Sequence, residues 1–252
     1  MNKDTLFLEN SNVMINSSTI PSIKHKYKDL LVTEVNVDKK LSLKLQKNIG
    51  KYITLMYDDN LLINNSKKLE KYFIINFKKV LKYLLLNSRS KILIVGLGNK
   101  NITSDSLGFH LIENLDLKEN SRISKIHKEV EGNTNIDTFE FISSLVKDLN
   151  IDAVIIVDSL KAYSINRLNN TIQISTGGIT PGSASNNSNS EISNITLGIP
   201  CIALGVPLVI DASVLSEKDE LKKLLVSTKE VDFYIEKTVK IISSSLRKIF
   251  IK

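Results

Sequence analysis

Two acidic residues lie where a pair of carboxyl groups could hydrolyse an amide bond. Asp158 directly follows the apolar run 153–157, and Asp105 opens a predicted helix after the glycine-containing loop that follows the run 92–95. In an open α/β sheet, sites form beyond the carboxyl ends of the strands. If these two strands are neighbours, both side chains reach one crevice although they are far apart in the sequence.

Two carboxyl groups in one poorly solvated crevice share a proton, because both cannot ionise freely. Such a pair supplies a general base that activates water and a general acid that protonates the leaving amine. Backbone N–H groups of the loop 96–99 could stabilise the oxyanion of that reaction. The spacing alone leaves a second interpretation open, in which Asp105 stabilises a helix N-terminus and Asp158 forms a turn at a strand end.

Other patterns that could carry chemistry are incomplete. Gly96-Leu97-Gly98 begins like a dinucleotide-binding loop, but Asn101 stands where the third glycine belongs. The segment 182–186 lacks the strand–turn–helix context of a nucleophile elbow. Cys201 lies inside an apolar strand and is expected to be an inert buried thiol. The histidines share no metal-ligand spacing: His25, His110 and His127.

The composition indicates a folded chain without a membrane span or a disulfide framework. The 252 residues are 42% hydrophobic, which is too apolar for a disordered chain, and no apolar run reaches the ~18 residues of a membrane span. A single cysteine excludes an internal disulfide and a cysteine-based zinc site. No secretory signal is visible, so we expect a cytoplasmic protein. The net charge of +7 comes from dispersed lysines, which favours solvated helix faces over a nucleic-acid surface.

The elements that must position the two aspartates alternate between strand and helix. Apolar runs at 92–95, 153–157 and 201–206 predict strands buried on both faces, hence parallel. Two further strands are predicted at 52–57 and at 171–175, the second with mixed faces. Apolar spacing of three to four residues predicts helices at 67–86 (capped by Ser66), 105–114, 137–149 and 229–250.

This alternation predicts an α/β fold, a mostly parallel sheet with helices on both faces. We expect a single domain over 1–252, with an irregular N-terminal segment over 1–20. Nine of the ten glycines lie between Gly96 and Gly205, so the unusual backbone geometry belongs to the middle of the chain. The Ser- and Asn-rich stretch 183–193 predicts an exposed loop that could contact a substrate.

The chain contains several distinctive sequence blocks: VGLGNKNITSDSLG at 95–108, GNTNIDT at 132–138, VDSL at 157–160, NNTIQI at 169–174, GITPGS at 178–183 and ALGVP at 203–207. In this order they resemble the germination protease (spore protease) family of endospore-forming bacteria. The resemblance covers roughly residues 48–250, which is far more specific than any single motif.

The resemblance implies an endopeptidase that degrades small acid-soluble spore proteins during germination, in the forespore or spore core. It implies an atypical aspartic-type hydrolase without a metal or other cofactor, and a fold related to hydrogenase-maturation endopeptidases. It also implies a homotetramer that forms from a self-processing zymogen. The two catalytic aspartates of the family fall on Asp105 and Asp158.

The sequence departs from the family beside Asp158, where Lys161-Ala162-Tyr163-Ser164 stands in place of Ala-Ser-Arg-Ser. Almost nothing precedes the segment 3–9, which faintly resembles the family's mature N-terminus, so no removable pro-segment is expected. Two alternatives therefore stay open. One is a catalytically inactive paralogue that binds spore proteins, and the other is a maturation peptidase that senses a metal on its partner protein.

Overall fold

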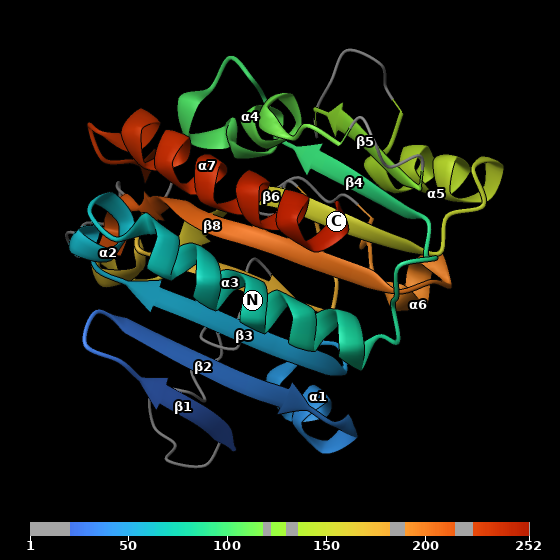
Figure 1. Ribbon diagram of the computed structural model, residues 1–252, viewed down its shortest axis with the longest axis horizontal. Coiled ribbons are helices and arrows are strands. Elements are labelled where there is room, and N and C mark those ends of the chain that lie inside the picture. The colour runs from blue at the N-terminus through green and yellow to red at the C-terminus, as the bar shows by residue number, and fades with distance from the viewer. Residues whose placement is uncertain (1–20, 118–121, 130–135, 182–189, 215–223, 252) are drawn as a thin grey trace.

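The computed structural model describes residues 21–117, 122–129, 136–181, 190–214 and 224–251. Within them, one sheet of nine strands runs in the order β1-β2-β3-β7-β8-β6-β4-β5, and β9 pairs with β8 (Figure 1). The strands are β1 (Ser22–Lys26), β2 (Leu30–Val37), β3 (Gly50–Tyr57), β4 (Ile92–Leu97), β5 (Ile123–Lys128), β6 (Ala153–Ala162), β7 (Thr171–Ser175), β8 (Cys201–Asp211) and β9 (Leu225–Val226). The α-helices are α1 (Lys39–Leu45), α2 (Asp59–Ile63), α3 (Ser66–Tyr83), α4 (Leu107–Asn114), α5 (Thr138–Asp148), α6 (Asn194–Leu197) and α7 (Val231–Phe250).

The sheet has a parallel half and an antiparallel half. β4 pairs in parallel with β5 and β6, and β6 pairs in parallel with β8, so the three predicted buried strands are parallel neighbours, as expected. Beyond β8 the sheet continues antiparallel through β7, β3, β2 and β1. The connection 163–170 between β6 and β7 is too short for a crossover helix, and β7 returns antiparallel. The α/β class is confirmed, with a mixed sheet in place of the mostly parallel one.

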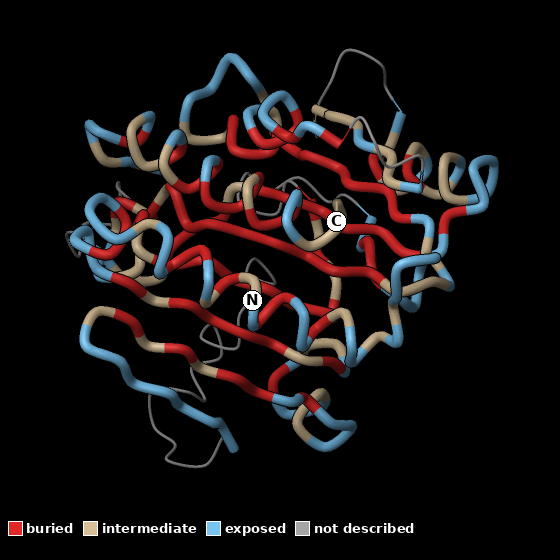
Figure 2. The backbone as a smooth tube through the Cα atoms, viewed as in Figure 1, coloured by how far each residue is buried: buried red, intermediate tan, exposed pale blue. Residues whose placement is uncertain are grey.

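Helices cover both faces of the sheet, as predicted, because its central strands are largely apolar on both sides. Figure 2 shows that these central strands are buried. On one face α3, α4 and α7 pack over the sheet, with Phe73, Leu111 and Ile242 fully buried. On the other face α5 and α6 pack against a second cluster that includes Ile156 and Ala203. We call this second side of the sheet the α5 face.

Several predicted boundaries shift in the structure. α3 begins at Ser66 itself, so the expected cap at Ser66 is wrong: the N-cap is Asn65, which makes no side-chain hydrogen bond to the helix. β6 and β8 run on to Ala162 and Asp211, because their pairing continues beyond the predicted strand ends, with a register shift between Leu160 and Lys161. Among the described residues, no helix is long and apolar enough to span a membrane.

Candidate active site

Asp158 lies within β6, one residue beyond the predicted end of the strand. Its side chain is on the α5 face, because Ile156 is two positions earlier and successive side chains alternate across a strand. Only 7% of Asp158 is exposed. Its Oδ1 accepts the backbone N–H of Ser159 at 2.8 Å, which is the one hydrogen bond described for this carboxyl group. Asp158 is therefore a buried carboxyl group with little hydrogen bonding to support a negative charge.

Asp105 is the last residue of a short 3₁₀ helix, η2 (Thr103–Asp105), that precedes α4. The predicted helix over 105–114 is thus divided, and its α-helical part begins at Leu107. The Oδ2 of Asp105 accepts the backbone N–H of Asn99 at 2.7 Å. This hydrogen bond holds the carboxyl group of Asp105 against the loop that follows β4. The sequence analysis considered the same loop as a candidate for stabilising an oxyanion.

Gly98 allows the loop after β4 to fold against Asp105. Its φ is +114°, in the left-handed region that favours glycine, and a Cβ built there would lie 1.9 Å from the carbonyl oxygen of Asp105. No side chain fits at that position without moving the backbone of η2. The glycine is thus required for the close approach that positions Asp105.

The two aspartates interact electrostatically across this edge of the sheet. Burial and the charge of Asp105 together raise the pKa of Asp158 from 3.8 to about 8, against the weaker opposing effect of the Ser159 hydrogen bond. Desolvation is the larger of the two causes. At neutral pH Asp158 therefore favours its protonated form. The structure brings together the two carboxyl groups that the strand-end argument selected, and their catalytic role stays a prediction.

The loop after β4 is also held by His127, a residue that the sequence analysis did not connect to the site. The carbonyl oxygen of Gly98 accepts a hydrogen bond from His127 Nε2 at 2.8 Å. The imidazole ring packs edge-on against Phe109 of α4, with ring centroids 5.1 Å apart. His127 comes from β5, the edge strand next to β4, and no motif marks it, so only the strand order could have revealed this contact.

One expectation for the glycine loop changes with the structure. The N–H of Asn99 was a candidate donor to an oxyanion, but it donates to Asp105 Oδ2. It therefore orients a carboxyl group instead of facing a substrate carbonyl. A bulky side chain at Gly98 would consequently displace Asp105 first, so its effect would not report on an oxyanion site.

The other sequence candidates lie apart from this pair. Cys201 is fully buried, and burial raises the pKa of its thiol to about 12, as expected for an inert cysteine. His25 is exposed on β1 and His110 is exposed on α4. In the part of the chain that the structure describes, no three His, Cys, Asp or Glu side chains form a group that could hold a metal. Most of the predicted loop 183–193 lies outside the described residues.

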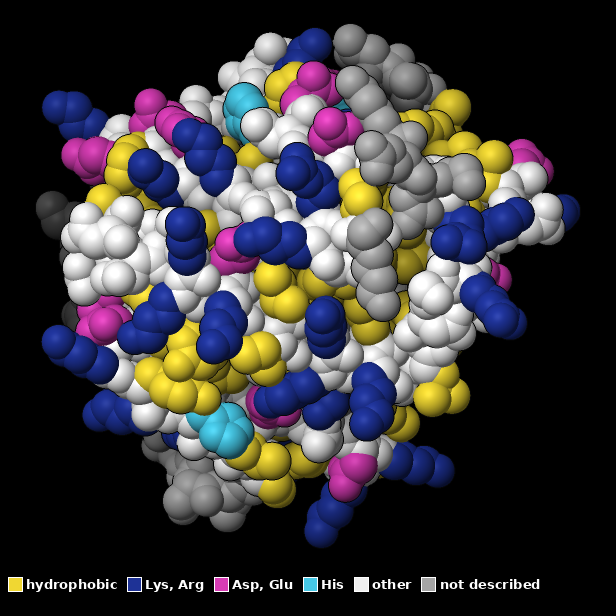
Figure 3. All heavy atoms as spheres, viewed as in Figure 1, with side chains coloured by type: hydrophobic (Ala, Val, Ile, Leu, Met, Phe, Trp, Pro, Cys, Tyr) yellow, Lys and Arg dark blue, Asp and Glu magenta, His cyan; other side chains and the backbone are white. Residues whose placement is uncertain are grey.

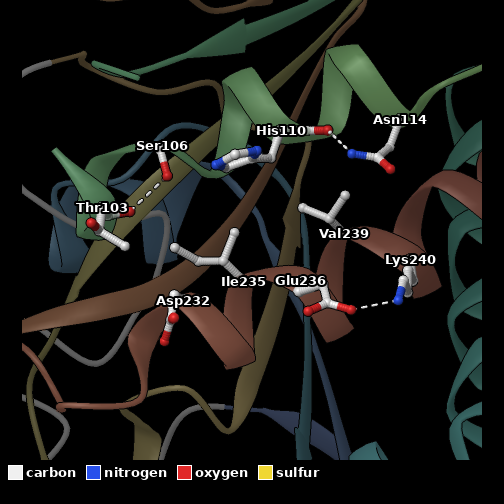
Figure 4. A pocket seen from close by; sticks show the side chains of 9 residues that line it. All are labelled: Thr103, Ser106, His110, Asn114, Asp232, Ile235, Glu236, Val239 and Lys240. Atoms are coloured by element: carbon white, nitrogen blue, oxygen red, sulfur yellow. Dashed lines mark hydrogen bonds and ion pairs between the residues drawn. The ribbon is translucent and has the colours of Figure 1, made fainter. Parts of the chain in front are cut away.

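A surface pocket of about 210 Å³ lies between α4 and α7 (Figure 4). Ile235 and Val239 of α7 form its apolar side, and the ion pair between Glu236 and Lys240 lies at its rim. Neither Asp105 nor Asp158 lines it. The pocket lies among the helices on the opposite side of the sheet from the α5 face, and Thr103 and Ser106, which flank Asp105 in the sequence, also line it.

Basic side chains are spread over the surface. On the face shown in Figure 3, Lys and Arg side chains are scattered and interspersed with Asp and Glu. Lys67 and Lys78 of α3 are among the exposed lysines. The view agrees with the interpretation of dispersed lysines as solvated helix faces.

Comparison with known proteins places the chain in a family. The model of the family described as "Germination protease" matches residues 8–221. The chain is 38% identical over 201 residues to a germination protease of Bacillus cereus (strain B4264), covering 72% of this chain and 54% of that protein. A germination protease of Bacillus anthracis (strain CDC 684 / NRRL 3495) is 38% identical over 202 residues, at 73% and 54% coverage. The chain thus spans about half the length of these curated relatives.

Two solved structures show a weaker likeness. A [NiFe] hydrogenase maturation protease, HycI, from Thermococcus kodakarensis KOD1 has a TM-score of 0.42 at 16% identity, covering 63% of this chain and 93% of that one. The hydrogenase maturating endopeptidase HybD from E. coli has a TM-score of 0.35 at 19% identity, with the same coverage.

The family assignment rests on the sequence matches alone. Because the family model covers most of its length, the chain belongs to the germination protease family.

Proposed function

We propose that this chain is an aspartic-type endopeptidase that degrades small acid-soluble spore proteins during germination. The observation that carries the proposal is the buried carboxyl group of Asp158, whose pKa is raised to about 8 by desolvation and by the charge of Asp105. Two carboxyl groups coupled in this way hold one proton between them at neutral pH, which is the state that acid–base hydrolysis of an amide needs. Family membership supports the same activity.

The environments of the two residues suggest their roles. Asp105 accepts the backbone N–H of Asn99, and we assign it the role of base: it takes a proton from water as the water oxygen attacks the peptide carbonyl carbon. Asp158 holds the other proton and gives it to the amine nitrogen as the C–N bond breaks. After this cycle the proton is on Asp105 and the charge is on Asp158. Transfer of that proton within the pair restores the starting state.

Incubation of the full chain with a purified small acid-soluble spore protein tests the activity. We expect discrete fragments, identified by mass spectrometry, and no effect of a chelator on their formation. A spore protein that is retained but never cut would favour the inactive paralogue. Cleavage that depends on added nickel would favour the metal-sensing maturation peptidase.

The family resemblance also leads us to propose a homotetramer located in the forespore. Light scattering on the purified full chain measures the molar mass directly. A tetramer of this 28.2 kDa chain would support the proposal, and a strictly monomeric protein would contradict it.

Gly98→Ala is expected to lower kcat by about 10²-fold, because the new Cβ meets the carbonyl oxygen of Asp105 and moves that residue by about an ångström. Gly198→Ala is the matched control. Gly198 also has a positive φ, +71°, but a Cβ there meets nothing within 4 Å. Both variants carry the backbone cost of about 1–2 kcal/mol, measured as stability to urea. Equal kcat values for the two variants would contradict the positioning role of Gly98.

A further inference from the structure

A single peptide group connects His127 to Asp105. Its carbonyl oxygen, that of Gly98, accepts a hydrogen bond from His127 Nε2 at 2.8 Å. Its N–H, that of Asn99, donates to Asp105 Oδ2 at 2.7 Å. A peptide group is planar, and in the trans form its C=O and N–H point in opposite directions. The imidazole and the carboxyl group therefore hold opposite ends of one rigid unit.

This peptide group follows a glycine, which makes its orientation easy to change. Gly98 has no Cβ and a φ of +114°, so little steric resistance opposes a rotation of the plane between Gly98 and Asn99. Such a rotation would turn the Asn99 N–H away from Asp105 and the carbonyl oxygen away from His127 together. The hydrogen bond at the oxygen consequently fixes the direction of the N–H. Hydrogen bonds in series also polarise one another, which strengthens the donation to Asp105.

The imidazole of His127 is itself held in place. In the parallel pairing of β5 with β4, His127 lies opposite Gly96, two residues before the carbonyl that it contacts. Its ring packs edge-on against Phe109 of α4. A carbonyl oxygen only accepts hydrogen bonds, so Nε2 carries a hydrogen in this contact. The strand and the aromatic ring thus present a preorganised donor to the loop.

His110 shows that a place beside Phe109 does not by itself provide this contact. Its ring centroid is 5.3 Å from that of Phe109, almost the same separation as for His127. His110 is exposed on α4, and among the described residues its ring makes no hydrogen bond. Of these two histidines, only His127 reaches the loop that holds Asp105.

We propose that His127 is a positioning residue that fixes the carboxyl group of Asp105 through the peptide group between Gly98 and Asn99. The inference rests on the proposed function, because it assigns His127 a part in the reaction of the carboxyl pair. His127 touches no reacting atom and transfers no proton. It sets the orientation of the N–H that Asp105 accepts.

His127→Phe removes the donor and keeps an aromatic ring against Phe109. We expect kcat for cleavage of a small acid-soluble spore protein to fall about tenfold, with KM changed by less than about threefold, because Asp105 is displaced while substrate contacts remain. His127→Gln should recover most of the loss, since its side-chain amide offers an N–H donor and gives up the ring. A role in packing alone predicts the reverse order, with the glutamine variant the more impaired.

His110→Phe is the matched control, because it makes the same substitution beside the same ring and should leave kcat unchanged. Urea unfolding checks that each variant is folded. If His127→Phe does not fold, His127→Leu, which also lacks the donor, takes its place. An undiminished kcat in the folded variant without the donor, or a glutamine variant slower than it, would overturn the proposal.

Hydrogen exchange at the Asn99 amide, measured by NMR, separates this inference from the proposed function. Exchange should become about tenfold faster in His127→Phe and stay unchanged in His127→Gln and His110→Phe. If the unaltered chain cuts nothing but this pattern appears, the hydrolytic proposal fails and the hold of His127 on the Asp105 loop stands. If the chain cuts and His127→Phe changes neither kcat nor exchange, the positioning role alone fails. No cleavage together with unchanged exchange would overturn both.

Discussion

Asp158→Asn is expected to abolish peptide-bond cleavage, with kcat reduced by at least about 10³-fold. Asparagine keeps the shape of the side chain but cannot give up a proton to the leaving amine, and general acid–base catalysis contributes about 10²–10⁴-fold. Asp105→Asn should have an effect of similar size, and the double variant should be little worse than either, because the two carboxyl groups act as a unit. Fragment formation from a spore protein, followed by mass spectrometry, measures all three.

Folding of the variants must be shown separately from activity. Asp158→Asn should not lower the unfolding midpoint, because it replaces a buried carboxyl group that carries little hydrogen bonding. Asp211→Asn, at the end of β8, is the control, since Asp211 hydrogen-bonds Ser213 and is not part of the pair. It should retain activity. Fragments that persist at an undiminished rate in Asp158→Asn would remove the carboxyl pair from the mechanism.

The strand-end argument could select Asp105 and Asp158 because it depends on features that are local in the sequence. Continuous apolar runs identify strands that are buried on both faces, and parallel strands place their carboxyl ends at one edge. The sequence alone could therefore predict that Asp105 and Asp158 lie at the same edge of the sheet. In the structure the charge of Asp105 raises the pKa of Asp158, so the two carboxyl groups interact. The hairpin of β1 and β2 was not predicted, because residues such as Lys24 and Thr33 give its strands no continuous apolar signal.

The parts of the site that the sequence could not show depend on pairings across the sheet. His127 reaches Gly98 from an edge strand that was not predicted. Such contacts are set by strand order, which a single sequence does not determine, whereas the Asp105–Asn99 hydrogen bond is local.

The stability of the chain is expected to fall as the pH rises from about 4 to about 8, through the titration of Asp158. Its pKa is raised from 3.8 to about 8, so over this range the folded chain holds a proton that the unfolded chain has released. A state that binds more protons loses stability as the proton concentration falls. Each tenfold change in proton affinity is worth about 1.4 kcal/mol, so the total loss is several kcal/mol. The stabilising contribution is fully present below pH 4 and has gone above pH 8.

Urea unfolding at pH 4, 6 and 8.5 measures this effect when the unaltered chain is compared with Asp158→Asn. The two free energies of unfolding should agree at pH 4 and diverge as the pH rises, with the variant the more stable, because asparagine cannot ionise in the buried site. Asp105→Asn should reduce the divergence without removing it, since desolvation, the larger cause of the raised pKa, remains. In the active chain, kcat should fall on the alkaline side near pH 8, where Asp158 loses the proton that the leaving amine requires. Parallel stability curves for the two chains would mean that Asp158 is ionised in the folded protein, and a different proton donor would then be needed.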